Sequence, residues 1–197
     1  AFADRAVWMG DADFSYVPAK GLINSDYTKL RGMPIVPTAR INPVPVAGDP
    51  REFDTAMAPD SRRYAARESF AGPGGATTHF SVVDKWGNMV SYTNTIESGY
   101  GAGMFAGTVQ SDGKFRSFGF LLNNELTDFS FVPVEDGRPV ANRVEAGKRP
   151  RSAMAPMLVF ERVPGERHGR LAMSLGSPGG SAIINYVAKV IVGTLDW

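Results

Sequence analysis

The sequence contains no cysteine and only two histidines, and these absences exclude several kinds of site. Without thiols the chain forms no disulfide and offers a metal no thiolate, and it is compatible with either a reducing or an oxidising compartment. His79 and His168 lie far apart in the sequence and are too few for a typical zinc site. We therefore predict no metal and no cofactor.

Long apolar runs and an excess of one charge are also missing. No run reaches the roughly 18 apolar residues of a membrane-spanning helix. The 21 basic and 20 acidic residues leave a formal net charge of +1, which favours neither nucleic acid nor an anionic membrane as a partner. With 197 residues, 43% of them hydrophobic, the chain has enough apolar side chains for a folded core.

The most informative stretch runs from Gly74 to Asp84. A glycine pair leads into two threonines and then into residues typical of a strand, so a hydroxyl lies where a loop becomes a strand. Attack by the Thr77 hydroxyl on the Ala76 carbonyl gives an ester that water hydrolyses, and Thr77 then has a free α-amine. That amine titrates near neutrality, so one residue supplies both nucleophile and base. Alternatively, the two threonines simply begin a strand, where threonine is favoured.

A hairpin predicted after this stretch gives Thr77 a partner. Lys85 to Gly87 has the composition of a hairpin loop closed by a glycine in the left-handed conformation. Pairing Asp84 with Asn88 then sets Thr77 directly opposite Thr95, within reach of a hydrogen bond between the two hydroxyls. A shift of register by one residue would separate them.

The remaining segments are predicted from periodicity and from cap signals. Helices are expected up to Gly10, after Asn24 as far as Gly32, and over residues 181–195. Strands are expected over 77–84, 88–97, 115–122, 154–161 and 170–175.

Three segments are predicted to be irregular. Asp11 to Asp13 is interpreted as a surface loop rather than a calcium loop, because later ligands are missing. Residues 34–75, rich in proline and glycine, suggest an extended linker with a helical turn near 61–68. Residues 131–147 mix proline, glycine and charge, which predicts a surface loop.

Four motifs in order resemble the γ-glutamyltranspeptidase family, in the small subunit of its members. They are Thr77 to Asp84, Leu121 to Ser130, Lys148 to Ser152 and Gly176 to Ser181. Residues 1–11 also resemble the end of that family's large subunit. One such motif alone is a weak signal, but four in the family's order are specific.

The resemblance implies the fold and the organisation of the chain. The fold is an α+β, N-terminal-nucleophile (Ntn) hydrolase αββα sandwich, present here in part. Residues 1–76 are then the end of the large-subunit region with a linker to the cleavage site, and residues 77–197 are the small-subunit core. The partners implied are the two subunits of one precursor, a γ-glutamyl donor, and water, an amino acid or a peptide as acceptor. Bacterial members are typically exported, which implies the periplasm or the exterior.

The resemblance also assigns an oxyanion hole and a pocket for the acyl group. Gly179 and Gly180 match the oxyanion pair, and glycine allows the backbone N–H groups to approach a substrate closely; the alternative is a tight turn from strand to helix. Glu125 and Asp128 match the positions that hold the substrate α-amine, although exposed loop acids have the same composition. Ser152 matches one of two serines that donate to the substrate carboxylate.

Two positions depart from the family pattern. The second serine is replaced by Ala153, and the asparagine usual two residues after Thr95 is replaced by Glu97. With Glu97, Glu125 and Asp128, the pocket is more acidic and poorer at holding a carboxylate. An amidase or acylase of the same family that takes another acyl group, or a family member without catalysis, therefore remains an alternative.

Overall fold

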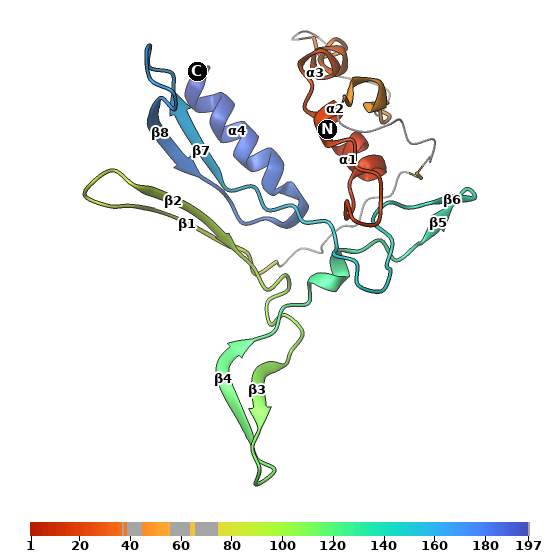
Figure 1. The fold of residues 1–197 in the computed structure, drawn as a ribbon, viewed down its shortest axis with the longest axis vertical. Helices are drawn as coiled ribbons and strands as arrows, with labels where there is room; N and C mark the ends of the chain where they lie inside the picture. Colours follow the sequence, from red (N-terminus) through yellow and green to blue (C-terminus); the bar gives the residue numbers. More distant parts are fainter. Residues whose placement is uncertain (37, 39–44, 56–63, 66–74, 197) are drawn as a thin grey trace. The chain divides into compact units, whose positions relative to one another are not determined.

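The computed structural model describes residues 1–36, 38, 45–55, 64–65 and 75–196. The chain forms two compact units, of which unit 1 comprises residues 1–69 and 126–151, and unit 2 comprises residues 70–125 and 152–197. Helices and antiparallel strands occur together in the chain (Figure 1), so the predicted α+β class is confirmed. Across the described part of the chain, every helix is too short or too polar to cross a lipid bilayer.

Unit 2 is built on three antiparallel hairpins followed by a helix (Figure 1). The hairpins pair β1 with β2, β3 with β4, and β7 with β8. Their bounds and that of the helix are β1 Thr78–Val83, β2 Met89–Asn94, β3 Phe105–Val109, β4 Phe115–Leu121, β7 Met157–Glu161, β8 Arg170–Leu175 and α4 Ile183–Leu195. Strand β8 also contacts β1 and β2, so two of the hairpins pack together.

The β1–β2 hairpin has the predicted register. Thr78 pairs with Asn94 and Val83 with Met89. The Asp84 carboxylate accepts hydrogen bonds from the backbone N–H groups of Trp86 and Asn88, and the loop closes at Gly87 with φ 85°. Because the side chain and the glycine both specify the turn, the register is fixed locally.

The sequence did not predict strand β3, although its partner β4 matches the strand expected over 115–122. Gly107 lies within β3, next to an irregularity of the ladder. A Cβ at Gly107 would lie 2.4 Å from the Arg116 carbonyl oxygen, so the two backbones approach closely there. Glycine has low strand propensity, so Gly107 gave no signal for a strand. The close approach that requires a glycine there depends on the partner strand β4.

Helix α4 follows a 3-10 turn, η3 Gly180–Ala182, and begins two residues after the predicted start. Ile183 and Val187 are buried, but Val190 and Leu195 are exposed. The apolar spacing therefore predicted the helix correctly, whereas only the first half of its apolar face is covered by the described residues.

Unit 1 contains short helices, the 3-10 turn η1 and a small hairpin. They are α1 Phe2–Trp8, α2 Ala19–Leu22, α3 Ser25–Gly32, η1 Arg51–Phe53, β5 Val134–Glu135 and β6 Arg138–Pro139. Asn24 caps α3 as predicted, since its side-chain oxygen accepts the N–H groups of Asp26 and Tyr27. The helical turn predicted near 61–68 falls mostly outside the described residues.

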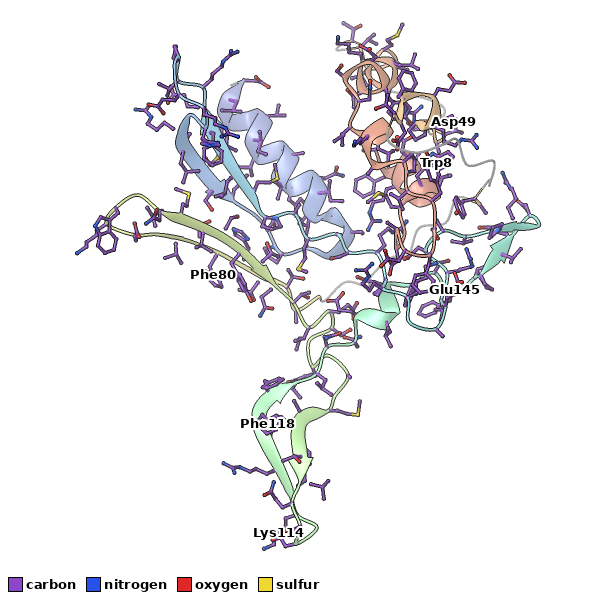
Figure 2. The ribbon with its side chains drawn as sticks, in the orientation of Figure 1. Trp8, Asp49, Phe80, Lys114, Phe118 and Glu145 are labelled. Carbon is purple, nitrogen blue, oxygen red and sulfur yellow. The ribbon has the colours of Figure 1, made fainter. Side chains whose placement is uncertain are left out.

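The core of unit 1 corrects two predictions. Trp8, Tyr16, Tyr64 and Ala141 are buried together, and Figure 2 shows Trp8 on α1. Residues 131–147 are therefore no simple surface loop, because Ala141 lies in this core. Asp11, expected in a surface loop, is buried as well. In both cases the cause is a contact between segments far apart in the sequence.

The Tyr27→Phe change is expected to lower the free energy of unfolding by about 1.5–3 kcal/mol, the usual range for a hydrogen bond to a charged group. Tyr27 is 2% exposed, and its hydroxyl donates to Asp4 Oδ1 at 2.8 Å. The N–H of Gly48 donates to the same oxygen at 2.8 Å. Urea unfolding of the full-length protein measures the change. Tyr100→Phe, at a 78% exposed site, is the matched control and should change the stability by less than about 0.5 kcal/mol.

Candidate active site

The hairpin register brings two hydroxyl groups together at the start of β1. The ladder pairs Thr78 with Asn94, and one step further Thr77 meets Thr95. The Thr77 hydroxyl donates to Thr95 Oγ1 at 3.1 Å, and both side chains are partly buried. The predicted hydrogen bond is thus confirmed.

The residues just before Thr77 are tied to the same segment through the backbone. Gly75 forms an antiparallel bridge with Ser98. The Ala76 N–H donates to the Glu97 carbonyl oxygen at 2.8 Å. The Ala76–Thr77 bond is therefore fixed on both sides, by a backbone hydrogen bond at Ala76 and by a hydroxyl pair at Thr77.

Glu97 has an unusual backbone and a fixed side chain. Its φ is 72°, in the left-handed region that most side chains avoid and asparagine tolerates better. Its N–H donates to Thr95 Oγ1 at 2.9 Å, and its carboxylate accepts the Ser98 hydroxyl at 2.5 Å. This conformation links the backbone at Glu97 directly to the partner of Thr77.

Asn124 connects this segment to the turn that carries Glu125. The Asn124 amide accepts the Ser98 N–H at 3.0 Å and donates to the Ser98 hydroxyl at 2.9 Å. Its own N–H donates to the carbonyl oxygen of Ile96 at 3.2 Å. The 3-10 turn η2, Glu125–Asp128, follows directly. Glu125 thus starts next to the segment that holds Thr95.

The other two predicted pocket residues come from other segments of the chain. Asp128 ends η2 and belongs to unit 1, whereas Thr77 belongs to unit 2. Ser152 is exposed, and its hydroxyl accepts the Met154 N–H at 3.4 Å. The roles of both residues in substrate binding stay predictions.

The glycine motif begins beside β1, the strand that follows Thr77. Ser81 and Ser174 hydroxyls lie 2.9 Å apart, which joins β1 to β8. At the end of β8, a Cβ on Gly176 would lie 2.2 Å from His79 Nδ1, so the His79 ring covers the Gly176 backbone. His79 Nδ1 is in turn 2.8 Å from Thr93 Oγ1.

Gly179 and Gly180 follow in the loop before α4. Their φ angles are 135° and 55°, both in the region that favours glycine. A Cβ at Gly179 would lie 2.6 Å from the Tyr186 ring, so the loop packs closely on the first turns of α4. The first N–H groups of a helix have no partner within the helix, which suits a developing negative charge.

The sequence alone did not indicate the hydrogen bonds between Ser98 and Asn124 or the contact between His79 and Gly176. Ser98 follows β2, and Asn124 precedes η2, so only the fold shows that they bond. For Gly176, the sequence signal was its place in the motif Gly176 to Ser181. The contacts of His79 with Thr93 and Gly176 are those of a strand histidine packed against its neighbours.

The whole chain is similar to known proteins. The family profile described as Gamma-glutamyltranspeptidase matches residues 1–197. The chain is 36% identical over 197 residues to the glutathione hydrolase proenzyme of Bacillus subtilis (strain 168), which covers 100% of the chain and 30% of that protein. It is 33% identical over 196 residues to the acylase ACY 1 proenzyme of Pseudomonas sp. (strain V22), covering 100% of the chain and 28% of that protein.

A solved structure of acivicin-inhibited gamma-glutamyltranspeptidase is 42% identical, with a TM-score of 0.46, and the match covers 60% of this chain and 58% of that one. The chain spans about 30% of the length of the curated glutathione hydrolase proenzymes. The profile match covers the whole chain. The chain belongs to the γ-glutamyltranspeptidase family.

Proposed function

We propose that the protein containing this chain is a self-cleaving N-terminal threonine hydrolase and transferase. It moves a γ-glutamyl group from glutathione or a related amide to water, an amino acid or a peptide. The observation that carries this proposal is the pairing of the Thr77 and Thr95 hydroxyls at 3.1 Å, next to an Ala76 that is fixed by Glu97. The proposed fold is the αββα sandwich of the Ntn hydrolases, and the proposed location is the periplasm or the exterior.

Maturation breaks the Ala76–Thr77 peptide bond. Thr77 Oγ attacks the Ala76 carbonyl carbon, the C–N bond breaks, and the Thr77 nitrogen takes up the hydroxyl proton. Water then hydrolyses the new ester, which leaves a carboxylate on Ala76 and a free amine on Thr77. The hydrogen bonds to Thr95 and Glu97 limit the motion of both reacting groups, which contributes to the rate.

In turnover, Thr77 Oγ, which attacks Ala76 during maturation, attacks the substrate. The Thr77 amine accepts the hydroxyl proton as Oγ attacks the acyl carbonyl, and it returns that proton to the departing amine. The backbone N–H groups of Gly179 and Gly180 stabilise the oxyanion, where loss of one donor typically costs about 3 kcal/mol. Water or an acceptor amine then attacks the ester and releases Thr77.

The γ-glutamyl specificity rests on the acidic groups. Glu125 and Asp128 bind the α-ammonium of the donor by charge-assisted hydrogen bonds, and Ser152 donates to its carboxylate. A second candidate is an acylase for a different acyl group. It is favoured by Glu97 and Ala153, which weaken carboxylate binding, and by the acylase among the relatives.

Two measurements on the full-length protein test the proposal. Intact mass and N-terminal sequencing are expected to show a fragment that begins at Thr77. Release of the aniline from a γ-glutamyl anilide and not from a glutaryl anilide supports the first candidate, and the reverse supports the acylase. A correctly cleaved protein that turns over neither would favour a non-catalytic role, and a chain that stays whole would contradict self-cleavage.

The Thr95→Val change is expected to slow both self-cleavage and turnover by about 10²-fold, the scale for losing one well-placed hydrogen-bonding group. Valine keeps the shape of threonine, but it removes the oxygen that accepts the Thr77 hydroxyl and the Glu97 N–H. Time courses of fragment formation and of aniline release measure the two rates. Thr95→Ser should retain most of each rate. Thr108→Val, at an exposed position, should change neither the cleavage rate nor the turnover rate. Unchanged rates in Thr95→Val would show that the hydroxyl pair has no role.

A further inference from the structure

Unit 1 is built from segments on both sides of the proposed cleavage site. Residues 1–69 precede Thr77 and residues 126–151 follow it, yet they form one compact unit. Once the Ala76–Thr77 bond is cut, this unit belongs to two separate chains. Contacts within it then join the two chains without a covalent link.

We propose that Arg149, together with Asp11, Asp13 and the buried Ala141, forms a clamp that keeps the two chains associated after cleavage. This inference rests on the proposed self-cleavage and assigns a structural role to the basic motif at 148–151. The partner that the clamp recognises is the other product of the same precursor.

The polar half of the clamp is a fork of hydrogen bonds from one arginine. Arg149 donates through Nε to Asp11 Oδ2 at 2.8 Å and through Nη2 to Asp11 Oδ1 at 2.6 Å. Its backbone N–H donates to Asp11 Oδ2 at 2.9 Å, and Nη2 also reaches Asp13 Oδ2 at 2.5 Å. The Asp11 side chain is 1% exposed, so this carboxylate is enclosed and depends on Arg149 for its charge partner.

Hydrogen bonding from Arg149 also holds the pKa of the Asp11 carboxyl well below its usual range, and the Asp11 carboxylate raises the pKa of Arg149. Both groups are therefore charged at neutral pH. A lysine at position 149 would keep the charge but would lack the planar fork that matches a carboxylate.

The apolar half of the clamp surrounds Ala141, which comes from the later segment. Trp8, Tyr16 and Tyr64, all from the earlier segment, are buried with it. The Ser15 hydroxyl donates to the Ala141 carbonyl oxygen at 3.0 Å in a buried position. Ala141 is thus seated in a core whose other members come from the opposite side of the cleavage site.

Two further hydrogen bonds cross the same boundary. Arg151 Nη1 donates to the Arg5 carbonyl oxygen at 2.9 Å. The Ala65 N–H donates to the Pro139 carbonyl oxygen at 3.0 Å. Arg149 and Arg151 thus both bond to the earlier segment. This use of their donors argues against a substrate-anion or nucleic-acid site at the motif.

The test separates the clamp from self-cleavage. A specific protease site is inserted between Ala76 and Thr77 in the full-length protein, in a Thr77→Ala background, so that the cut is made by the added protease. Association of the two chains is then measured by size exclusion and by dissociation on dilution at increasing salt. Failure of the natural cleavage leaves this experiment unaffected.

We expect the cut parent protein to stay associated and the cut Arg149→Gln protein to dissociate with a Kd raised by about tenfold or more. Arg149→Lys should give an intermediate Kd. Arg170→Gln is the matched control, because Arg170 is 73% exposed, Arg149 is 70% exposed, and Arg170 pairs with Glu161 on its own side of the cut. An unchanged Kd in Arg149→Gln would overturn the proposal.

Thermal unfolding of the uncut variants shows whether the substitution affects folding itself. If uncut Arg149→Gln fails to fold, the decision passes to Asp13→Asn, whose side chain is 74% exposed. The expected increase in Kd for this variant is about threefold, because an exposed ion pair contributes less. A Kd equal to that of the cut parent would then overturn the clamp.

Discussion

The Thr77→Ala protein is expected to remain a single chain and to lose turnover by at least about 10⁴-fold, as enzymes do when their nucleophile is removed. Alanine has no hydroxyl to attack the Ala76 carbonyl, so neither the ester nor the free amine can form. Intact mass measures the loss of self-cleavage, and aniline release from the anilide substrate measures the loss of turnover. Such a large effect is expected because, in the proposed mechanism, Thr77 supplies the attacking oxygen and, after cleavage, the base.

Thr78→Ala is the matched control for this change. Thr78 is the neighbouring threonine, it is exposed, and it pairs with Asn94 in the ladder. Strand geometry puts its side chain on the opposite face from Thr77. Thr78→Ala should therefore be cleaved normally, and Thr77→Ser should be cleaved with some loss of rate. A Thr77→Ala protein that is still cut after Ala76 by its own activity would contradict the assignment.

Local signals predicted the part of the site that depends on one hairpin. Asp84 and Gly87 specify the turn, the turn sets the register, and the register places Thr77 opposite Thr95. Every step uses residues close in sequence, so the sequence is sufficient to predict it. The prediction that Asn24 caps α3 was correct for the same reason.

Contacts between distant segments could not be predicted in this way. Asp11 and Arg149 are separated by 138 residues, and an Asp-Ala-Asp loop has the same composition whether it is exposed or paired. The burial of Ala141 depends on Trp8 and Tyr64, which no period in residues 131–147 reveals. Complementary charge between the aspartate loop and the basic motif was the one available signal, and it has many possible partners in a chain with 20 acidic residues.

The oxyanion assignment shows an intermediate case. The ordered glycines indicated a close approach of backbone, but the sequence did not show what approaches. In the structure, β8 contacts β1 and β2, and His79 covers Gly176 at the start of the motif. The predicted nucleophile and the predicted oxyanion loop are thus connected through one imidazole.

This connection predicts a large effect of Gly176→Ala, the second substitution with strong consequences. The added Cβ would lie 2.2 Å from His79 Nδ1 and 2.4 Å from its Cε1, far inside contact distance. The ring cannot move away freely, because Nδ1 lies 2.8 Å from Thr93 Oγ1. Overpacking of this kind typically costs about 1–3 kcal/mol of stability. Because His79 is two residues after Thr77 and Gly176 is three residues before Gly179, we also expect turnover to fall by about 10²-fold.

A double substitution tests whether His79 is the cause. His79→Ala removes the ring, so Gly176→Ala should have a much smaller effect on stability and turnover in the His79→Ala protein than in the parent. Urea unfolding gives the coupling in stability, and aniline release from the anilide substrate gives the coupling in turnover. Gly193→Ala is the matched control, since a Cβ there meets no atom within 4 Å, and an alanine within α4 should be neutral or stabilising. Losses that simply add in the double variant would show that His79 does not transmit the effect of Gly176.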